Sequence, residues 1–293
     1  MGVLNDKRCK MITCDLMGGL GNQLFQIFAT ISYAAKHKVR FNFLYSEMLV
    51  NRITYWNTFL VRLKGFTHLK LPDARIIKEN GFHYKEIVSP NLIQQNGIMV
   101  KENLKLYGYF QSYKYFQDNY DTICKLINLQ KQKDRIVYKY MQNYTSLVSM
   151  HFRLGDYKLL QDFHPIMKLE YYKNSIQYII KKMNHNNLKI LYFSEKKDEL
   201  LVDENINKLK EIFPYCIFIK AFDYAADWEQ MLMMSLCSHN IIANSTFSWW
   251  GAYFNSNKEK IVCYPDVWFG PRLINVNDTG DLFPEDWIKI NSN

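Results

Sequence analysis

Residues 149–157 read Ser-Met-His-Phe-Arg-Leu-Gly-Asp-Tyr, and this stretch decides the fold of the second half of the chain. The apolar run that leads into it is typical of a strand, and Gly155 predicts a turn directly after it. Side chains alternate along a strand, so His151 and Arg153 are expected on one face where the strand ends. Open α/β sheets bind ligands at this edge, which makes the stretch a candidate binding site.

Arg153 is a candidate phosphate ligand. Its guanidinium is permanently charged and can donate two parallel hydrogen bonds to paired oxygens. The alternative is a surface ion pair between Arg153 and Asp156. Short motifs have many chance matches, so the stretch alone favours the ion pair.

Strand and helix patterns alternate regularly from Thr145 onward. The expected strands are 147–153, 189–193, 216–219, 240–243 and 260–264, and the expected helices are 169–180, 202–213, 226–238 and 247–256. This alternation requires right-handed crossovers and gives a parallel sheet covered on both faces. The C-terminal half is therefore predicted to be a doubly wound α/β domain.

Polar residues follow several of these strands. Ser194 and Glu195 follow one, and Asn244, Ser245 and Thr246 follow another. Ser245 and Thr246 stand where a helix is expected to begin, so their hydroxyls and the free N–H groups would hold a phosphate that Arg153 reaches. The alternative is ordinary capping of that helix.

A glycine-rich turn near the start is a second candidate phosphate site. An apolar strand leads into residues 18–23, Gly-Gly-Leu-Gly-Asn-Gln, and an amphipathic helix follows with Asn22 as its expected N-cap. The dinucleotide fingerprint fails, because Leu24 stands where a third small residue is required. This disfavours a Rossmann-type oxidoreductase. The alternative role of Gly19 and Gly21 is to form a tight turn only.

The rest of the N-terminal half gives a weaker pattern. We expect a strand over 39–44, an irregular region over 45–102, a strand over 104–112 and a helix over 113–129, followed by a charged linker over 130–138. A length of 293 residues favours two domains. The predicted division is 1–144 and 145–293.

Composition limits the function classes. The net charge is +9 and the pI is near 9.0, but Lys and Arg are scattered, so a nucleic-acid-binding face is not indicated. The six cysteines show no metal-ligand spacing and are expected to be reduced. No apolar run approaches 18 residues and the start carries no apolar signal core. We expect a soluble, cytoplasmic protein with no transmembrane segment, for which peripheral membrane contact stays open.

Five motifs, taken in order, resemble the motif series of the α-1,2-fucosyltransferases, glycosyltransferase family eleven. They are residues 18–26, 108–112, 151–157, 192–195 and 244–252, and together they span nearly the whole chain. The resemblance implies an inverting enzyme of the GT-B type, with two Rossmann-like domains facing a cleft. It also implies transfer of L-fucose from GDP-β-L-fucose to the 2-hydroxyl of a galactose-like residue of a glycan, without a metal or other cofactor. In that family pattern, residues 1–144 would form the acceptor-side domain and residues 145–293 the GDP-fucose-binding domain.

The candidate site follows from these motifs. The candidate catalytic residues are Arg153, His151 and Asp156, and the candidate nucleotide-binding residues are Arg153, Ser194, Glu195, Asn244, Ser245, Thr246, Gly19, Gly21 and Asn22. The sequence departs from the family pattern at Leu154, where many members carry a second Arg, and at Glu195, where Asp is common. These departures put a second pyrophosphate contact at 154 in doubt and alter how residue 195 meets the nucleotide.

The residues themselves agree with a metal-independent reaction. No Asp-x-Asp occurs in the sequence, so Arg153, helix N-termini and neutral donors must meet the charge of the leaving group. Inversion needs one displacement, in which a base removes the proton of the attacking hydroxyl. Asp156, His151 and Asp15 are the candidates for that base, and the sequence does not choose among them.

Overall fold

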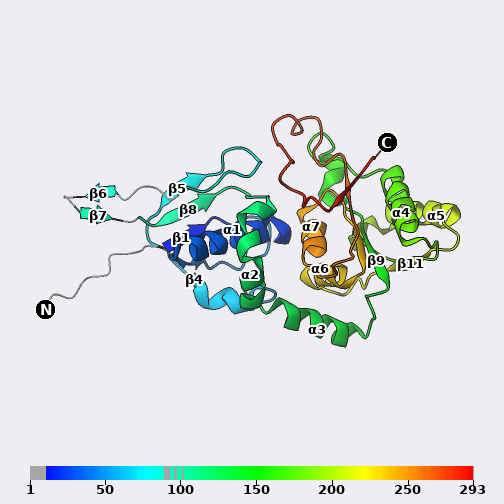
Figure 1. The fold of residues 1–293 in the computed structure, drawn as a ribbon, viewed down its shortest axis with the longest axis horizontal. Coiled ribbons are helices and arrows are strands. Elements are labelled where there is room, and N and C mark those ends of the chain that lie inside the picture. The colour runs from blue at the N-terminus through cyan, green and yellow to red at the C-terminus, as the bar shows by residue number, and fades with distance from the viewer. Residues whose placement is uncertain (1–10, 89–92, 96–97, 101, 293) are drawn as a thin grey trace. The chain divides into compact units, whose positions relative to one another are not determined.

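The computed structural model describes residues 11–88, 93–95, 98–100 and 102–292, which fall into two compact units (Figure 1). Unit 1 comprises Met1–Gln130 and Asp278–Phe283, and unit 2 comprises Lys131–Asn277 and Pro284–Asn293. Each unit contains a parallel sheet with helices. The predicted α/β class with two Rossmann-like domains is therefore confirmed. The cleft between them stays a prediction.

The sheet of unit 1 is parallel throughout. Its strands, in spatial order, are β2 (Arg40–Phe41), β1 (Met11–Cys14), β8 (Leu104–Tyr107) and β5 (Arg75–Lys78). Helix α1 (Leu20–His37) packs beside β1, and its residues up to Ala34 are almost all buried. Two small sheets complete the unit: β3 (Phe43–Leu44) with β4 (Thr67–His68), and β6 (Ile93–Gln95) with β7 (Ile98–Val100).

Three predictions for unit 1 are corrected. Asn22 is not the N-cap of α1, because the helix begins at Leu20 and Gly19 is its N-cap. The strand expected over 39–44 is two strands, since β2 pairs with β1 and β3 pairs with β4. The helix expected over 113–129 is two 3₁₀ turns, η2 (Tyr113–Tyr115) and η3 (Gln117–Asn119), followed by α2 (Tyr120–Leu126).

The predicted linker is a helix. Residues Leu129–Tyr140 form α3, because Leu129, Ile136 and Tyr140 are buried at helical spacing beneath the charged face. The Tyr140 hydroxyl donates to Glu229 Oε2 at 2.8 Å, and Lys139 Nζ lies 2.7 Å from Glu229 Oε1. These contacts attach α3 to the second unit, so the units divide after Gln130 and not after residue 144.

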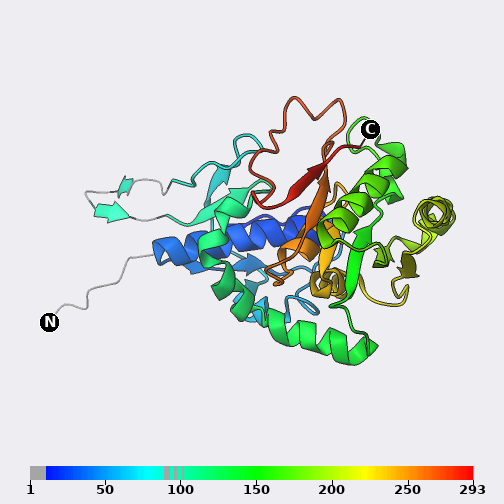
Figure 2. The same ribbon diagram turned by 45° about the vertical axis from the view of Figure 1, so that its right-hand side comes forward.

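Unit 2 contains a six-stranded sheet in which every pair is parallel. The spatial order is β11 (Ile217–Lys220), β10 (Lys189–Phe193), β9 (Leu147–His151), β12 (His239–Ile241), β13 (Val262–Pro265) and β14 (Ile288–Ile290). The expected strands are present within about two residues. Strand β14 was not predicted; it lies beside β13 at the edge of the sheet (Figure 2).

Helices cover both faces of this sheet. Helices α4 (Leu169–Met183) and α5 (Glu199–Ile212) pack on the face that carries Val148 and Met150, and together they form the main hydrophobic core. On the opposite face, Asn240 Nδ2 donates to Ser149 Oγ at 2.7 Å and to the carbonyl of Met234 in α6 (Asp227–Leu236) at 2.8 Å. Helix α7 (Thr246–Tyr253) packs beside α6. The doubly wound domain is thus confirmed.

Two further expectations concern composition. Cys14, Cys216, Cys237 and Cys263 are free thiols, and all four are buried. Burial raises the pKa of the Cys14 thiol to about 12, so this residue is an unreactive part of the core. Within the described ranges, no helix has both the length and the apolar character that crossing a membrane requires.

Candidate active site

The candidate site lies where the strand order of unit 2 reverses. The chain passes from β9 to β10 and β11 on one side of the sheet, and then returns to place β12 on the other side of β9. Parallel α/β sheets bind ligands outside the carboxyl ends of their strands at such a reversal. Arg153 follows β9 and Asn244 follows β12, so these two residues flank the reversal.

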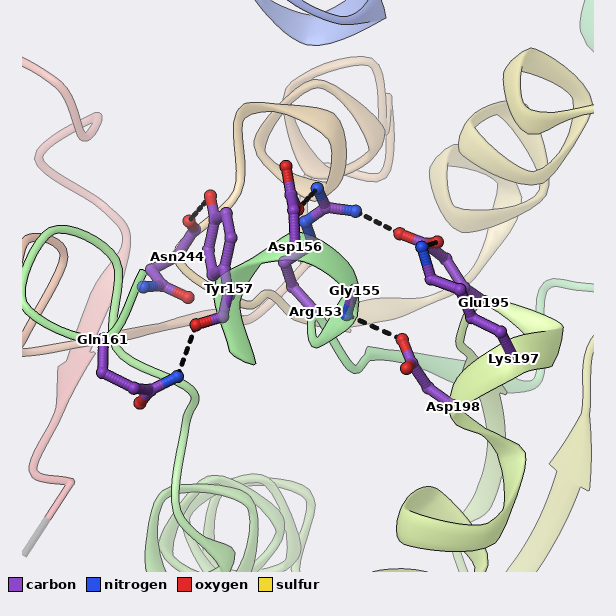
Figure 3. Close-up of polar contacts among 9 residues, drawn as sticks. All are labelled: Arg153, Gly155, Asp156, Tyr157, Gln161, Glu195, Lys197, Asp198 and Asn244. Carbon is purple, nitrogen blue, oxygen red and sulfur yellow. Dashed lines mark hydrogen bonds and ion pairs between the residues drawn. The ribbon is translucent and has the colours of Figure 1, made fainter. Parts of the chain in front are cut away.

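Arg153 is held between two carboxylates (Figure 3). Its Nη2 pairs with Asp156 Oδ1, and its Nη1 pairs with Glu195 Oε1. The guanidinium also lies over the ring of Tyr157, 4.9 Å from the ring centroid. Glu195 is in turn paired through Oε2 with Lys197 at 2.7 Å. Side chains from the ends of two neighbouring strands thus meet at this cation.

The ion pair between Arg153 and Asp156 is the one that the alternative interpretation of the sequence predicted. This ion pair does not use all the hydrogen-bond donors of the guanidinium. The group has five N–H donors, and the described ion pairs involve only Nη1 and Nη2. The Arg153 side chain is 21% exposed and therefore accessible to a ligand. Asp156 and Glu195 are about half exposed, where ion pairs are weak, so an anion can compete with them.

The turn after Arg153 requires glycine. Gly155 has φ +45°, and a Cβ on it would lie 2.6 Å from Glu195 Oε1 and 3.4 Å from Arg153 Nη1. This turn, η4 (Gly155–Leu159), is tied to the next strand end, because the Gly155 N–H donates to Asp198 Oδ2 at 2.7 Å. Asp198 was not among the predicted site residues. Its only signal in the sequence is an Asp placed directly before a helix.

His151 is buried at the end of β9, 5.5 Å from the ring of Phe247 in α7. Burial, with a smaller contribution from the Arg153 cation, lowers the pKa of His151 to about 3. The imidazole is therefore neutral near pH 7 and can donate or accept a hydrogen bond. Such a low pKa makes it a poor general base, which weighs against one of the three predicted candidates.

Three buried polar atoms at this edge have no hydrogen-bond partner among the described residues. They are His151 Nδ1, Ser194 Oγ and Asn244 Oδ1, and they follow or end the adjacent strands β9, β10 and β12. The Asn244 amide is fixed, since its Nδ2 donates to the carbonyls of Pro165 at 2.9 Å and Trp268 at 3.2 Å. Unpaired buried polar atoms destabilise a protein, so their grouping here is typical of a site that a ligand completes.

The start of α7 completes this edge of the sheet. Ser245 is the N-cap and Thr246 the first helical residue, one residue before the expected start at 247, and the Ser245 side chain makes no capping bond within the described chain. The ordinary capping role is therefore not observed for Ser245. The N-terminus of an α-helix carries partial positive charge and attracts anions. The Tyr157 hydroxyl donates to the Asn244 carbonyl at 3.1 Å, which joins this segment to the turn after β9.

The remaining predicted residues belong to unit 1. Gly18, and not Gly19 or Gly21, has a positive φ of +73°, and a Cβ on it would lie 2.4 Å from Asn22 Nδ2. Asn22 Oδ1 accepts a hydrogen bond from Gln111 Nε2 at 3.0 Å. Asp15 ends the first strand and lies 3.3 Å from Lys105 Nζ. Their part in the nucleotide site stays a prediction.

A metal centre was not expected. Among the described residues, no group of three or more His, Cys, Asp or Glu side chains is arranged to hold a metal ion. The acidic residues around Arg153 are instead paired with cations of the chain: Asp156 and Glu195 with Arg153, and Asp198 with Lys158 at 2.6 Å. Metal independence itself stays a prediction.

Comparisons with known proteins place the chain in a family. The O-antigen biosynthesis glycosyltransferase WbnK of Escherichia coli is 31% identical over 65% of this chain, and the match spans 62% of WbnK. The alpha-1,2-colitosyltransferase of Escherichia coli is 26% identical over 96% of this chain and 99% of its own.

Solved structures resemble the chain more distantly. ADP-heptose LPS heptosyltransferase II of E. coli has a TM-score of 0.48 at 9% identity, over 96% of this chain and 90% of its own. A mutant of Arabidopsis thaliana FUT1 in complex with GDP has a TM-score of 0.47 at 13% identity, over 96% of this chain and 82% of its own. The model of the family described as Glycosyl transferase family 11 matches residues 3–291. Since that match covers nearly the whole sequence, the protein belongs to glycosyl transferase family 11.

Proposed function

We propose that this glycosyltransferase moves L-fucose from GDP-β-L-fucose to the 2-hydroxyl of a galactose-like residue of a glycan, with inversion at the anomeric carbon. One observation carries the proposal: Arg153 lies at the reversal of the strand order, beside buried polar atoms that have no partner in the described chain. Family membership supports glycosyl transfer, and the name of the colitosyltransferase relative supports a 1,2-linkage.

In the proposed reaction, the acceptor hydroxyl oxygen attacks the anomeric carbon of fucose from the side opposite the nucleotide. A new carbon–oxygen bond forms as the bond to the β-phosphate oxygen breaks, and GDP leaves with the electron pair of that bond. Negative charge therefore grows on the diphosphate. Arg153 and the N-terminus of α7 are the groups that we expect to stabilise this charge.

The proton of the acceptor hydroxyl must pass to a base or to water. The low pKa of His151 makes it the least suitable of the three candidates. Asp156 belongs to the Arg153 cluster, while Asp15 lies at a strand end of unit 1. We propose Asp156 or Asp15 for this role, without choosing between them.

We place acceptor selection in unit 1, in the irregular region 45–102. In the structure, residues 75–80, which include β5, and residues 85–88 line a cavity of about 530 Å³, which Phe110 and Tyr115 also border. The rings of Phe110 and Tyr115 pack edge to face, 5.3 Å apart. Aromatic side chains suit an acceptor glycan, because a pyranose ring presents an apolar face of C–H groups.

A donor and acceptor screen tests the proposed function. The purified protein would be incubated with GDP-β-L-fucose and a panel of galactosides, and the product linkage determined by NMR. We expect α-fucose on the 2-hydroxyl. Use of another hydroxyl would contradict the linkage, and failure with every GDP-linked donor would contradict the donor class.

A second candidate is colitosyl transfer. The relative named as an alpha-1,2-colitosyltransferase aligns with almost all of this chain, which favours including a GDP-linked colitose in the same screen. The two donors would be compared by kcat/KM on one acceptor, because specificity is the ratio of these values. A higher kcat/KM for colitose would replace fucose in the proposal and keep the site.

Thermal shift separates the proposed class from the alternatives. A ligand present at 100 times its Kd adds about 2.7 kcal/mol to the free energy of unfolding. We expect GDP to stabilise the protein and NAD to have no effect. Stabilisation by NAD alone would favour an oxidoreductase, and salt-dependent DNA binding without a GDP effect would favour a nucleic-acid-binding protein.

A further inference from the structure

We propose, on the basis of the function proposed above, that Asp198 is a positioning residue. It fixes the turn on which two neighbours of Arg153, Asp156 and Tyr157, are located. Asp198 ends the 3₁₀ turn η5 (Lys196–Asp198) and is the N-cap residue of α5. An Asp at this position ordinarily accepts an N–H of the first helical turn. Within the described chain its side chain makes no such bond, and Oδ2 instead accepts the Gly155 N–H at 2.7 Å.

The Asp198 carboxylate is buried and charged. Its side chain is 1% exposed, and Oδ1 lies 2.6 Å from Lys158 Nζ. Burial alone would raise the pKa of Asp198, but the Lys158 ammonium and the Gly155 N–H outweigh it, and the net shift is downward. A buried carboxylate stays ionised only when it is paired and hydrogen-bonded, so both contacts are needed to hold it.

Both partners of Asp198 belong to one turn. Gly155 begins η4 and Lys158 lies near its end. Between them stand Asp156, whose carboxylate pairs with Arg153, and Tyr157, whose ring lies under the Arg153 guanidinium. By holding the turn at Gly155 and Lys158, Asp198 fixes the two neighbours that orient the guanidinium; Figure 3 shows the contact with Gly155. It therefore acts on Arg153 through the turn, in contrast to Glu195, which contacts Arg153 directly.

Glu229 is a matched control in the same unit. Its side chain is 8% exposed, and it accepts hydrogen bonds from Tyr140 at 2.8 Å and from the Ala226 N–H at 3.0 Å, in addition to its ion pair with Lys139. The pKa of Glu229 is also lowered: burial raises it, but these contacts outweigh the burial. Glu229 thus has the same chemistry as Asp198, but its partners lie on α3 and before α6.

The test compares Asp198→Asn with Glu229→Gln. GDP affinity would be measured by titration calorimetry on folded protein, and kcat and KM for the donor determined separately. We expect both variants to lose thermal stability. Only Asp198→Asn should lose about tenfold in GDP affinity or kcat, because a misplaced contact group costs rate even when the fold is intact. Glu229→Gln should stay within about twofold of wild type in both quantities.

A double-mutant cycle gives a second readout. If Asp198 acts through Arg153, Asp198→Asn should add little to the loss in Arg153→Ala, so the two effects are not additive. Should Asp198→Asn fail to fold, Lys158→Met replaces it, since this variant removes the ion pair from the side chain that is 37% exposed. It should lower GDP affinity or kcat in the same direction.

Two failures are distinguishable. Normal GDP affinity and kcat in Asp198→Asn, together with a defective Arg153→Ala, would overturn the role of Asp198 and leave the proposed function standing. Equal losses in Asp198→Asn and Glu229→Gln would also overturn it, since both would then report general stability. Absence of GDP binding by the wild-type protein would instead contradict the proposed function.

Discussion

The carboxyl edges of the two sheets use their polar residues differently. In unit 1, several side chains that follow the strands are paired within the unit, although Gln23 Oε1, in the first turn of the helix after β1, has no partner among the described residues. Glu79 accepts the N–H groups of Tyr109 at 2.7 Å and Phe110 at 2.9 Å, and Gln111 donates to Asn22. This edge is occupied by contacts that stabilise the loops after β5 and β8.

In unit 2, the same edge brings together a cation and buried polar atoms. Arg153 has two partially exposed carboxylate partners, while His151 Nδ1, Ser194 Oγ and Asn244 Oδ1 have no partner among the described residues. Two parallel sheets of similar construction therefore differ in what their strand ends leave for a ligand. Buried polar atoms without a partner, at a strand edge that also carries a cation, mark a candidate binding site.

The largest expected effect follows from removing that cation. Arg153→Ala should lower kcat/KM on the order of a hundredfold, a loss of at least about 3 kcal/mol of transition-state stabilisation, because in the proposed reaction the guanidinium meets the charge that grows as GDP leaves. Steady-state kinetics on folded protein checks this. Arg153→Lys keeps the charge without the planar fork, so it should recover only part of the activity.

A folded Arg153→Ala protein with normal GDP affinity and rate would remove the difference between the two edges. Arg153 would then be only the ion-pair partner of Asp156 and Glu195. A loss confined to KM would show that Arg153 binds the ground state and transition state equally well.

Acidification should affect the two edges in opposite directions. The unfolded pKa of His is about 6.5, and that of His151 in the fold is about 3, so the unfolded state binds more protons between these values. Unit 2 therefore loses stability as the pH falls through this window, by about 2 kcal/mol between pH 7 and pH 5. Burial raises the pKa of Glu79 despite its two N–H bonds, so this carboxyl makes unit 1 relatively more stable at low pH.

Amide hydrogen exchange at the two pH values, corrected for intrinsic rates, measures the opening free energy of each sheet. In the control His151→Gln, the extra loss of opening free energy that unit 2 shows at the lower pH should disappear, because glutamine does not titrate. An unchanged pH dependence in this control would assign the loss to other groups of unit 2.

A smaller effect separates two neighbouring glycines of unit 1. Gly18→Ala should destabilise the protein by about 1–2 kcal/mol, since Gly18 has a left-handed φ and its Cβ would meet Asn22. Gly19→Ala should cost less than about 1 kcal/mol, because φ is −79° and its Cβ would have no described atom within 4 Å. Urea unfolding checks both values.

Gly19→Ala is therefore a clean test of whether this turn contacts substrate. A loss of activity beyond the loss of folded protein would show that unit 1 also contributes its edge to the site. Activity that follows the folded fraction would confine Gly19 to a role in the turn.

The sequence predicted unit 2 more completely than unit 1, for a local reason. In unit 2 the apolar strands alternate with amphipathic helices, so period and length identify each element without knowledge of its neighbours. In unit 1, Asn128 adopts φ +56° and separates α2 from α3, which no apolar pattern indicates. At the start of unit 2 the pattern is weaker too: the charges of α3 hid a stripe formed by Leu129, Ile136 and Tyr140, so a helix resembled a linker.

The candidate site was predictable to the extent that it is local. Arg153 and the start of α7 follow from strand ends and a helix start, and the structure places them at one edge of one sheet. The contact between Asp198 and Gly155 spans 43 residues and depends on a left-handed turn. A bond between residues so far apart leaves no periodic pattern in the sequence. An Asp directly before a helix would instead be taken for an ordinary N-cap.

The last prediction is an absence of effect: transfer should continue in EDTA. At the edge of unit 2 the nearby carboxylates pair with Arg153 and Lys158, and in the proposed reaction Arg153 meets the charge of the leaving group in place of a metal. Activity would be measured after EDTA treatment and after adding Mg²⁺ or Mn²⁺. Loss in EDTA with recovery by either ion would make Asp156 and Glu195 candidate metal ligands. Their pairing with Arg153 would then be a resting arrangement, and the cation that distinguishes the two edges would be the metal.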